Sequence, residues 1–118
     1  NSAAGGVSCS VDLSTGRFGQ GRKWQSENWQ DCPVHPDTQV VVEGEIPGWE
    51  QVKAQLLRIS SYIPQVIYLG YDVVITDDGF KIIEINSHQA IHMIQTRTPL
   101  LKDALTRDFF AGLRPPLR

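Results

Sequence analysis

YDVVITDDGFKIIEIN, residues 71–86, predicts a β-hairpin, because runs rich in Val and Ile flank the turn sequence Asp77-Asp78-Gly79. Two registers fit this turn. A two-residue Asp78-Gly79 turn places Asp72 opposite Ile85. A three-residue loop with Gly79 in the left-handed conformation pairs Thr76 with Phe80 and places Asp72 opposite Glu84. We favour the second register, since a one-residue slip would send the two acids to opposite faces.

In the favoured register, three oxygen-bearing side chains share one face of the hairpin: Asp72, Glu84 and Asn86. The opposite face is then filled by Val73, Ile75, Ile83 and Ile85. Two carboxylates about 5 Å apart repel each other in a bare sheet. Two carboxylates and a carboxamide are hard oxygen ligands that suit Mg²⁺ or Mn²⁺. The hairpin therefore predicts a metal site, and Mg²⁺ commonly completes its shell with substrate phosphates.

A purely structural interpretation of the same residues stays open. Asp72 could lie exposed at the sheet edge, Glu84 could pair with Lys81 or an arginine, and Asn86 could cap the next turn. Surface ion pairs of this kind are common and weak.

The remaining pattern predicts an α+β fold, an antiparallel sheet with helices on one face. Expected strands cover residues 7–13, 17–24, 38–45 and 66–68, with a loop over 25–37. Apolar residues at helical spacing predict an amphipathic helix that buries Trp49, Val52, Leu56, Ile59 and Ile63. A second helix is expected to start at a Thr98 cap with Pro99 and to end at Gly112, burying Leu101, Ala104, Leu105 and Phe109.

Composition sets limits on function. The chain has 118 residues, about one domain, and a formal net charge of −2, which gives no reason to expect binding to nucleic acid or to acidic membranes. No apolar run approaches the roughly 18 residues that span a bilayer. Cys9 and Cys32 could form one disulfide, but such sparse cysteines are rather expected as free thiols in a reducing cytoplasm. A chain that starts without Met is expected to be a piece of a longer protein.

Other motifs give weaker hypotheses. GRFGQGRK, residues 16–23, nearly spells a phosphate-binding P-loop, but its last two positions carry Arg22 and Lys23 and no helix pattern follows. His88 and His92 are four residues apart, yet a zinc site needs three or four ligands. His88 is expected close to the predicted metal site. The tryptophans are expected to pack rather than to bind a ligand.

Four segments in order resemble the sugar-transfer associated ATP-grasp proteins. They are GGVSCSVDLSTG (5–16), HPDTQ (35–39, with Gln39 in place of the usual Gly), GEIPGW (44–49) and YLGYDVVITDDGFKIIEIN (68–86). In that family a strand Asp is followed about a dozen residues later by Glu-x-Asn. The likeness extends to IQTRTPLLKD and so covers nearly the whole chain.

The resemblance implies roles. Asp72 and Glu84 would bind Mg²⁺ or Mn²⁺, Glu84 bridging two ions, and Asn86 would hold the second ion against ATP phosphates. It also places His35, in its HPDT segment, near the acceptor. The parent enzyme would activate a small-molecule carboxylate through an acyl-phosphate, as a ligase or as a kinase, in polysaccharide biosynthesis.

Residues 1–118 would form a single partial domain, the C-terminal portion of the ATP-grasp module, with 114–118 as a disordered tail. The lysines and flexible loop that cover ATP phosphates would come from sequence before residue 1. The chain alone is expected to be inactive and to self-associate through exposed apolar surface. The alternative is a non-catalytic α+β binding or interaction domain that keeps the fold.

Overall fold

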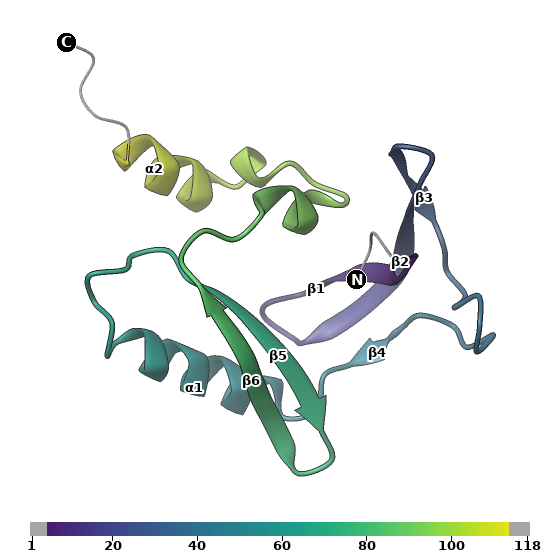
Figure 1. The fold of residues 1–118 in the computed structure, drawn as a ribbon, viewed down its shortest axis with the longest axis horizontal. Helices are drawn as coiled ribbons and strands as arrows, with labels where there is room; N and C mark the ends of the chain where they lie inside the picture. Colours follow the sequence, from purple (N-terminus) through teal and green to yellow (C-terminus); the bar gives the residue numbers. More distant parts are fainter. Residues whose placement is uncertain (1–4, 114–118) are drawn as a thin grey trace.

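The computed structural model describes residues 5–113, apart from the side chains of His92 and Met93. The tail predicted over 114–118 lies outside the described residues. The strands are β1 (Val7–Val11), β2 (Arg17–Gln25), β3 (Asn28–Asp31), β4 (Gly44–Glu45), β5 (Gly70–Thr76) and β6 (Gly79–Asn86). The helices are α1 (Trp49–Ser60), α2 (Ala104–Gly112) and two 3₁₀ helices, η2 (Ile91–Gln95) and η3 (Leu100–Lys102). Figure 1 shows this arrangement.

The predicted α+β fold is confirmed, with its antiparallel strands divided between two sheets. The first has the order β1-β2-β3, with β4 also paired to β2, and the second is the β5–β6 hairpin. Beside the hairpin runs α1, while η2, η3 and α2 follow β6 beyond its end (Figure 1). Among the described residues, neither α-helix has the length and apolar character needed to cross a bilayer.

The first strand stops earlier than the alternating pattern predicts. Asp12 ends β1, because its carboxylate accepts hydrogen bonds from the backbone N–H groups of Ser14 (2.8 Å) and Thr15 (2.9 Å). These bonds hold the predicted turn and lower the pKa of the Asp12 carboxyl, the Ser14 hydroxyl contributing most. Leu13 is therefore 71% exposed instead of lying in a half-buried strand.

The loop predicted over 25–37 is partly wrong, since residues 28–31 form β3. A tight turn at Ser26 and Glu27, both with positive φ (52° and 62°), returns the chain along β2. Trp24 lies opposite Trp29, with ring centroids 5.4 Å apart in an edge-on arrangement. Cross-strand aromatic pairs stabilise a hairpin whose other residues are polar, so no alternation marks this strand.

Two predicted strands are mostly absent. Over 38–45 the described chain forms one isolated bridge, Val34 with Val41, and the two-residue β4. Gln39 has a positive φ of 58°, which breaks an extended run there and is a conformation that glycine adopts more readily. Residues 66–68 are irregular, and regular pairing begins only at Gly70.

Helix α1 forms where it was predicted and connects the two sheets, but it ends at Ser60, so Ile63, expected in its buried stripe, lies beyond it. At its first turn, the Trp49 indole N–H (3.0 Å) and the Lys53 ammonium (2.7 Å) both donate to the carbonyl of Leu13. At its last turn, the Ser60 hydroxyl lies 2.7 Å from the Tyr71 hydroxyl of β5. The predicted stripe faces inward, with Val52 only 3% exposed.

The C-terminal helix begins later than predicted. Leu100–Lys102 form the 3₁₀ helix η3, and Asp103 caps α2 by accepting from the Thr106 N–H (2.7 Å). The Thr98–Pro99 start is therefore wrong. Leu105, expected in the buried face, is 81% exposed.

Arg22 joins this C-terminal region to the first sheet. Its guanidinium donates to the carbonyls of Thr96 and Trp29 and lies 3.2 Å from the Asp31 carboxylate. Thr96 is itself only 6% exposed.

Cys9 and Cys32 are free thiols, as predicted. Cys9 belongs to β1 and Cys32 pairs with Gly21 across from β2, so one strand separates them. Two strand spacings, about 9–10 Å, exceed the Cα separation of about 7 Å that a disulfide tolerates. Burial raises the pKa of the Cys9 thiol, which makes it less reactive.

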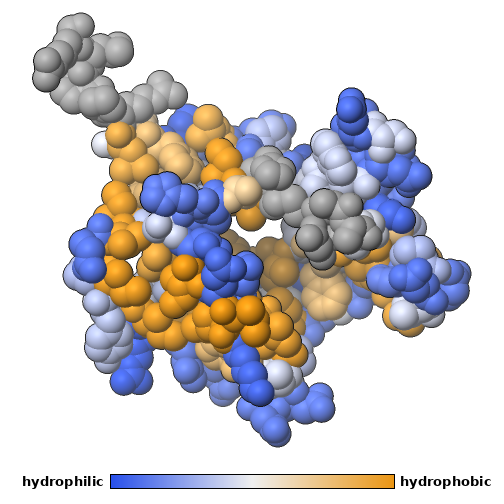
Figure 2. All heavy atoms as spheres, viewed as in Figure 1, coloured by the Kyte–Doolittle hydropathy of each residue, from blue (hydrophilic) through white to orange (hydrophobic). Residues whose placement is uncertain are grey.

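The hydrophobic core is small for a chain of this length. Val52 is the one hydrophobic side chain classed as buried among those the structure describes. The radius of gyration is 16.1 Å, against about 13.5 Å for a compact domain of this size. Figure 2 shows hydrophobic residues gathered over the hairpin and over α2, beside a hollow facing the first sheet.

Candidate functional site

The register of the hairpin brings the predicted acids together. Asp72 pairs with Glu84, and Gly70 pairs with Asn86. Because residues two apart in a strand share a face, Asp72, Glu84 and Asn86 lie on the same side of the hairpin. The predicted pairing of the two acids is confirmed.

The turn reaches this register by a route that neither prediction contained. Thr76 pairs with Gly79, so the loop holds only Asp77 and Asp78. A β-bulge then shifts the register between the Val73–Ile82 pair and the Asp72–Glu84 pair. Without the extra residue, Ile83, the ladder would have placed Asp72 opposite a hydrophobic side chain and Glu84 on the other face.

The bulge also changes the apolar face. Ile83 was expected to pack there but is 68% exposed, and Ile82 takes its place opposite Val73. This face is the one that carries Tyr71, whose hydroxyl contacts Ser60 of α1. Helix α1 therefore covers the apolar side of the hairpin and leaves the acid-bearing side open.

A pocket of about 600 Å³ opens at the end of the hairpin where β5 starts and β6 ends. Its lining includes Asp72 and Asn86 from the two strands, with His88 and Gln89 from the segment after β6. Tyr68, just before β5, also lines the pocket. Asp72 and Asn86 thus share a cavity large enough for a small ligand.

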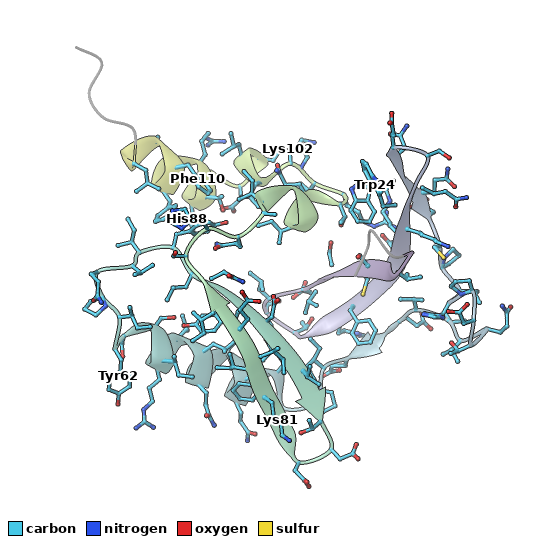
Figure 3. The ribbon with its side chains drawn as sticks, in the orientation of Figure 1. Trp24, Tyr62, Lys81, His88, Lys102 and Phe110 are labelled. Carbon is cyan, nitrogen blue, oxygen red and sulfur yellow. The ribbon has the colours of Figure 1, made fainter. Side chains whose placement is uncertain are left out.

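The predicted site residues differ in how they relate to this pocket. Glu84 is exposed beside Asp72 but does not line the cavity itself. His88 lines it, with its Nδ1 2.8 Å from the Ser87 hydroxyl, on the segment marked in Figure 3. His35 lies in the loop before β4, where its Nδ1 accepts from the Asp37 N–H (3.3 Å), and does not line this pocket.

The acids have no cationic partner in the described part of the chain. Ion pairs within residues 5–113 join Arg22 and Arg97 to Asp31 and Lys53 to Glu50, so neither Lys81 nor an arginine neutralises Glu84 there. The mutual repulsion of Asp72 and Glu84 therefore stands without an internal counter-charge.

The donor set fits a hard divalent cation. Two carboxylates and one carboxamide on one face are oxygen ligands of the kind that Mg²⁺ takes from proteins before phosphates and water complete its shell. No cluster of three or more His, Cys, Asp or Glu side chains occurs among the described residues. The side chain of His92, half of the weighed zinc pair, lies outside the described residues.

The P-loop alternative is wrong. Residues 17–25 form strand β2, and Arg22 and Lys23 pair with β1 and β3 instead of opening a helix around a phosphate. Trp49 and the Trp24–Trp29 pair serve packing, as expected.

Sequence reasoning missed two residues of the pocket, Tyr68 and Gln89. Both flank the hairpin in irregular segments, where no periodicity marks a functional side chain. The one available signal was their position, two residues before β5 and three residues after Asn86.

The family model of the sugar-transfer associated ATP-grasp proteins matches residues 1–106, which is most of the 118-residue chain. The chain belongs to the sugar-transfer associated ATP-grasp family. Searches of the curated proteins and of the solved structures gave no significant match. The family match contains the whole hairpin and the pocket residues up to Ile94, so the acid pair lies within the ATP-grasp region. Membership in an ATP-grasp family indicates a nucleotide-binding protein.

Proposed function

We propose that this chain is the metal- and ATP-phosphate-binding portion of an ATP-grasp, ligase-like enzyme. The observation that carries the proposal is the direct pairing of Asp72 with Glu84, with Asn86 on the same face and a pocket beside them. Two carboxylates that face each other without a counter-charge destabilise the sheet, whereas a divalent cation bound between them would turn this repulsion into attraction.

Each residue of the set has a proposed role. Asp72 and Glu84 would hold Mg²⁺ (or Mn²⁺), Glu84 as a ligand shared by two ions, and Asn86 at the end of β6 would support the second ion. When bound, Mg²⁺ offsets the charge that the β- and γ-phosphates of ATP carry during phosphoryl transfer. The pocket beside Asp72 and Asn86 then receives the phosphates or the acceptor, with His88 at its wall.

The proposed reaction of the parent enzyme is ATP-dependent activation of a small-molecule carboxylate through an acyl-phosphate, in polysaccharide biosynthesis. A kinase that uses the same metal clamp is the nearest variant. We propose that the 118 residues alone do not turn over ATP. ATP chemistry and two free thiols suit a cytoplasmic protein.

A second candidate function has its own observation. Several large hydrophobic side chains are strongly exposed, including Leu105 (81%), Tyr62 (72%) and Leu57 (71%). Exposed apolar side chains mark interaction sites where they form a contiguous patch. A non-catalytic domain that binds another protein through such side chains is the alternative.

Paramagnetic broadening by Mn²⁺ tests the proposed metal site. In a ¹H–¹⁵N spectrum of the chain, substoichiometric Mn²⁺ should first broaden the amide signals of Asp72, Glu84 and Asn86. The acids of the turn, Asp77 and Asp78, are the internal control for unspecific binding to carboxylates. Equal broadening at the turn and at Asp72 would contradict the proposal.

The proposed inactivity of the 118-residue chain is tested by adding about 1 mM Mg-ATP, near the upper range of typical KM values, and measuring phosphate release. Single-turnover levels or less are expected. Multiple turnovers by the 118-residue chain would contradict this part of the proposal.

A further inference from the structure

Strand β6 has an unpaired edge within the described part of the chain. Its sheet holds only β5 and β6, so one edge of β6 has no neighbouring strand among the described residues. In Figure 1, β5 lies on the side of the hairpin nearer β4, and β6 lies on the side away from it. An unpaired edge presents backbone N–H and C=O groups that can pair with another strand. Because a two-stranded sheet is only marginally stable by itself, a further strand would stabilise the hairpin.

The sequence of β6 is suited to pairing with a second copy of itself. Residues 80–85 read FKIIEI, with one basic and one acidic residue placed symmetrically about the centre. When two such segments run antiparallel about a twofold axis between Ile82 and Ile83, Lys81 of each chain lies opposite Glu84 of the other. At the remaining positions of 80–85, apolar residues lie opposite apolar residues.

The β-bulge places both charges of β6 on the same face. Lys81 and Glu84 are three residues apart, and in a regular strand they would point to opposite faces. In the hairpin, Lys81 pairs with Val74 and Glu84 pairs with Asp72, and these two residues of β5 share a face. The extra residue, Ile83, therefore gives β6 what antiparallel self-pairing needs, since residues directly opposite each other must lie on one face.

A second copy of β6 supplies a partner for each of these charges. Lys81 and Glu84 are both exposed, and neither forms an ion pair among the residues that the structure describes. Figure 3 shows Lys81 on the hairpin. Other described edge strands lack this complementarity, because β1 has no charged residue, β3 has only Asp31 and β5 has only Asp72. Charge complementarity thus favours β6 as the edge that pairs with its own copy.

We propose that two copies of this chain join through β6, antiparallel about a twofold axis, to form a continuous four-stranded sheet in the order β5-β6-β6-β5. Main-chain hydrogen bonds and the isoleucines at the centre supply affinity, and the two Lys81–Glu84 pairs fix the register. Exposed ion pairs add little affinity, so the dimer is weak and dissociates in the dilute samples used for unfolding experiments. The proposal requires neither metal nor nucleotide.

Charge reversal tests this interface, with sedimentation velocity in EDTA as the measurement. At about 100 µM, a concentration that reveals weak association, the wild-type chain should sediment as a dimer. Lys81→Glu and Glu84→Lys each set like charges opposite each other at both pairs, so each should weaken the dimer roughly ten- to a hundredfold. Lys102→Glu is the matched control, because it makes the same charge change at an exposed lysine of η3 and should leave the dimer unchanged.

Mixing the two variants separates a lost interface from a lost fold. An equimolar mixture of Lys81→Glu and Glu84→Lys chains should form a heterodimer, because one β6 then carries two acids and the other two lysines. A chain with both substitutions should pair with itself again. A monomeric wild-type chain, a dimer that survives Lys81→Glu, or a mixture that stays monomeric would overturn the proposal. Because EDTA is present and nucleotide is absent, failure here is distinct from a failure of Mn²⁺ to broaden Asp72.

Discussion

Asp72 and Glu84 face each other as direct cross-strand partners, and among the side chains that the structure describes no basic group pairs with either carboxylate. Like charges in this position destabilise a sheet by roughly 0.2–1 kcal/mol. Glu84→Gln should therefore raise the free energy of unfolding of the metal-free chain by about that amount. The same variant should lose the stabilisation that Mn²⁺ gives the wild-type chain. Urea unfolding with EDTA or with Mn²⁺ measures both effects.

Asp78→Asn is the matched control for this change, because it removes one carboxylate from the same hairpin at the exposed turn. It should leave the Mn²⁺ effect intact. A metal-free Glu84→Gln chain that is less stable than wild type would mean that Glu84 has a favourable partner in the folded protein.

The hairpin shows which part of the site the sequence could predict. The pairing of Asp72 with Glu84 was the favoured of two registers that the sequence allowed, but the two-residue turn and the bulge at Ile83 were not predicted. A three-residue loop and a bulge each add one residue to the ladder, so both give the same register at Asp72. The pattern alone cannot decide where the extra residue lies.

Elsewhere the prediction failed where tertiary contacts override local pattern. Strand β3 carries one apolar residue, Trp29, and depends on its contact with Trp24. Val40 and Val41 belong to an apolar run that makes one isolated bridge, Val41 with Val34, in the described part of the chain, and they stay 61% and 53% exposed. A segment with high strand propensity forms a strand only when another strand pairs with it, and the local sequence does not show which segment that is.

Gly16 is expected to be needed for the contact between the β1–β2 turn and α1. It has a positive φ of 76°, and a Cβ there would lie 2.6 Å from the Cβ and Cγ of Trp49. Gly16→Ala should destabilise the chain by about 2 kcal/mol or more, from left-handed strain together with overpacking. Thermal unfolding with Trp fluorescence measures the loss.

Gly112→Ala is the comparison for Gly16→Ala, since nothing lies within 4 Å of an added Cβ at the end of α2. It should be neutral or stabilising by up to about 1 kcal/mol, because alanine favours helix more than glycine does. Equal losses in the two variants would show that the Gly16–Trp49 contact is not what the substitution disturbs.

Acid stability should depend on Asp12. Hydrogen bonds from the Ser14 hydroxyl, then from backbone N–H groups, hold the pKa of its carboxyl below the ordinary value. A lowered folded-state pKa gives stability that is fully present above the unfolded-state pKa of about 3.9 and is lost as the pH falls through the lowered value. Asp12→Asn should therefore flatten the decline in unfolding free energy below about pH 4. Asp103 has a pKa lowered in the same direction by Thr106, so part of the decline should remain.

Self-association of the chain should involve the open face of the hairpin. Ile83 in the bulge is 68% exposed and Val74 of β5 is 49% exposed, in the region where Figure 2 shows hydrophobic atoms gathered. Unpartnered apolar patches of this kind pair in solution, so wild-type chain at about 100 µM should sediment as more than a monomer. Ile83→Lys should shift the population toward monomer.

Leu57→Lys is the control, because it also replaces an exposed aliphatic side chain with lysine, at a 71% exposed position of α1, and it should have little effect. If the wild-type chain is monomeric at that concentration, or if Leu57→Lys is the variant that dissociates it, the hairpin face is not the contact.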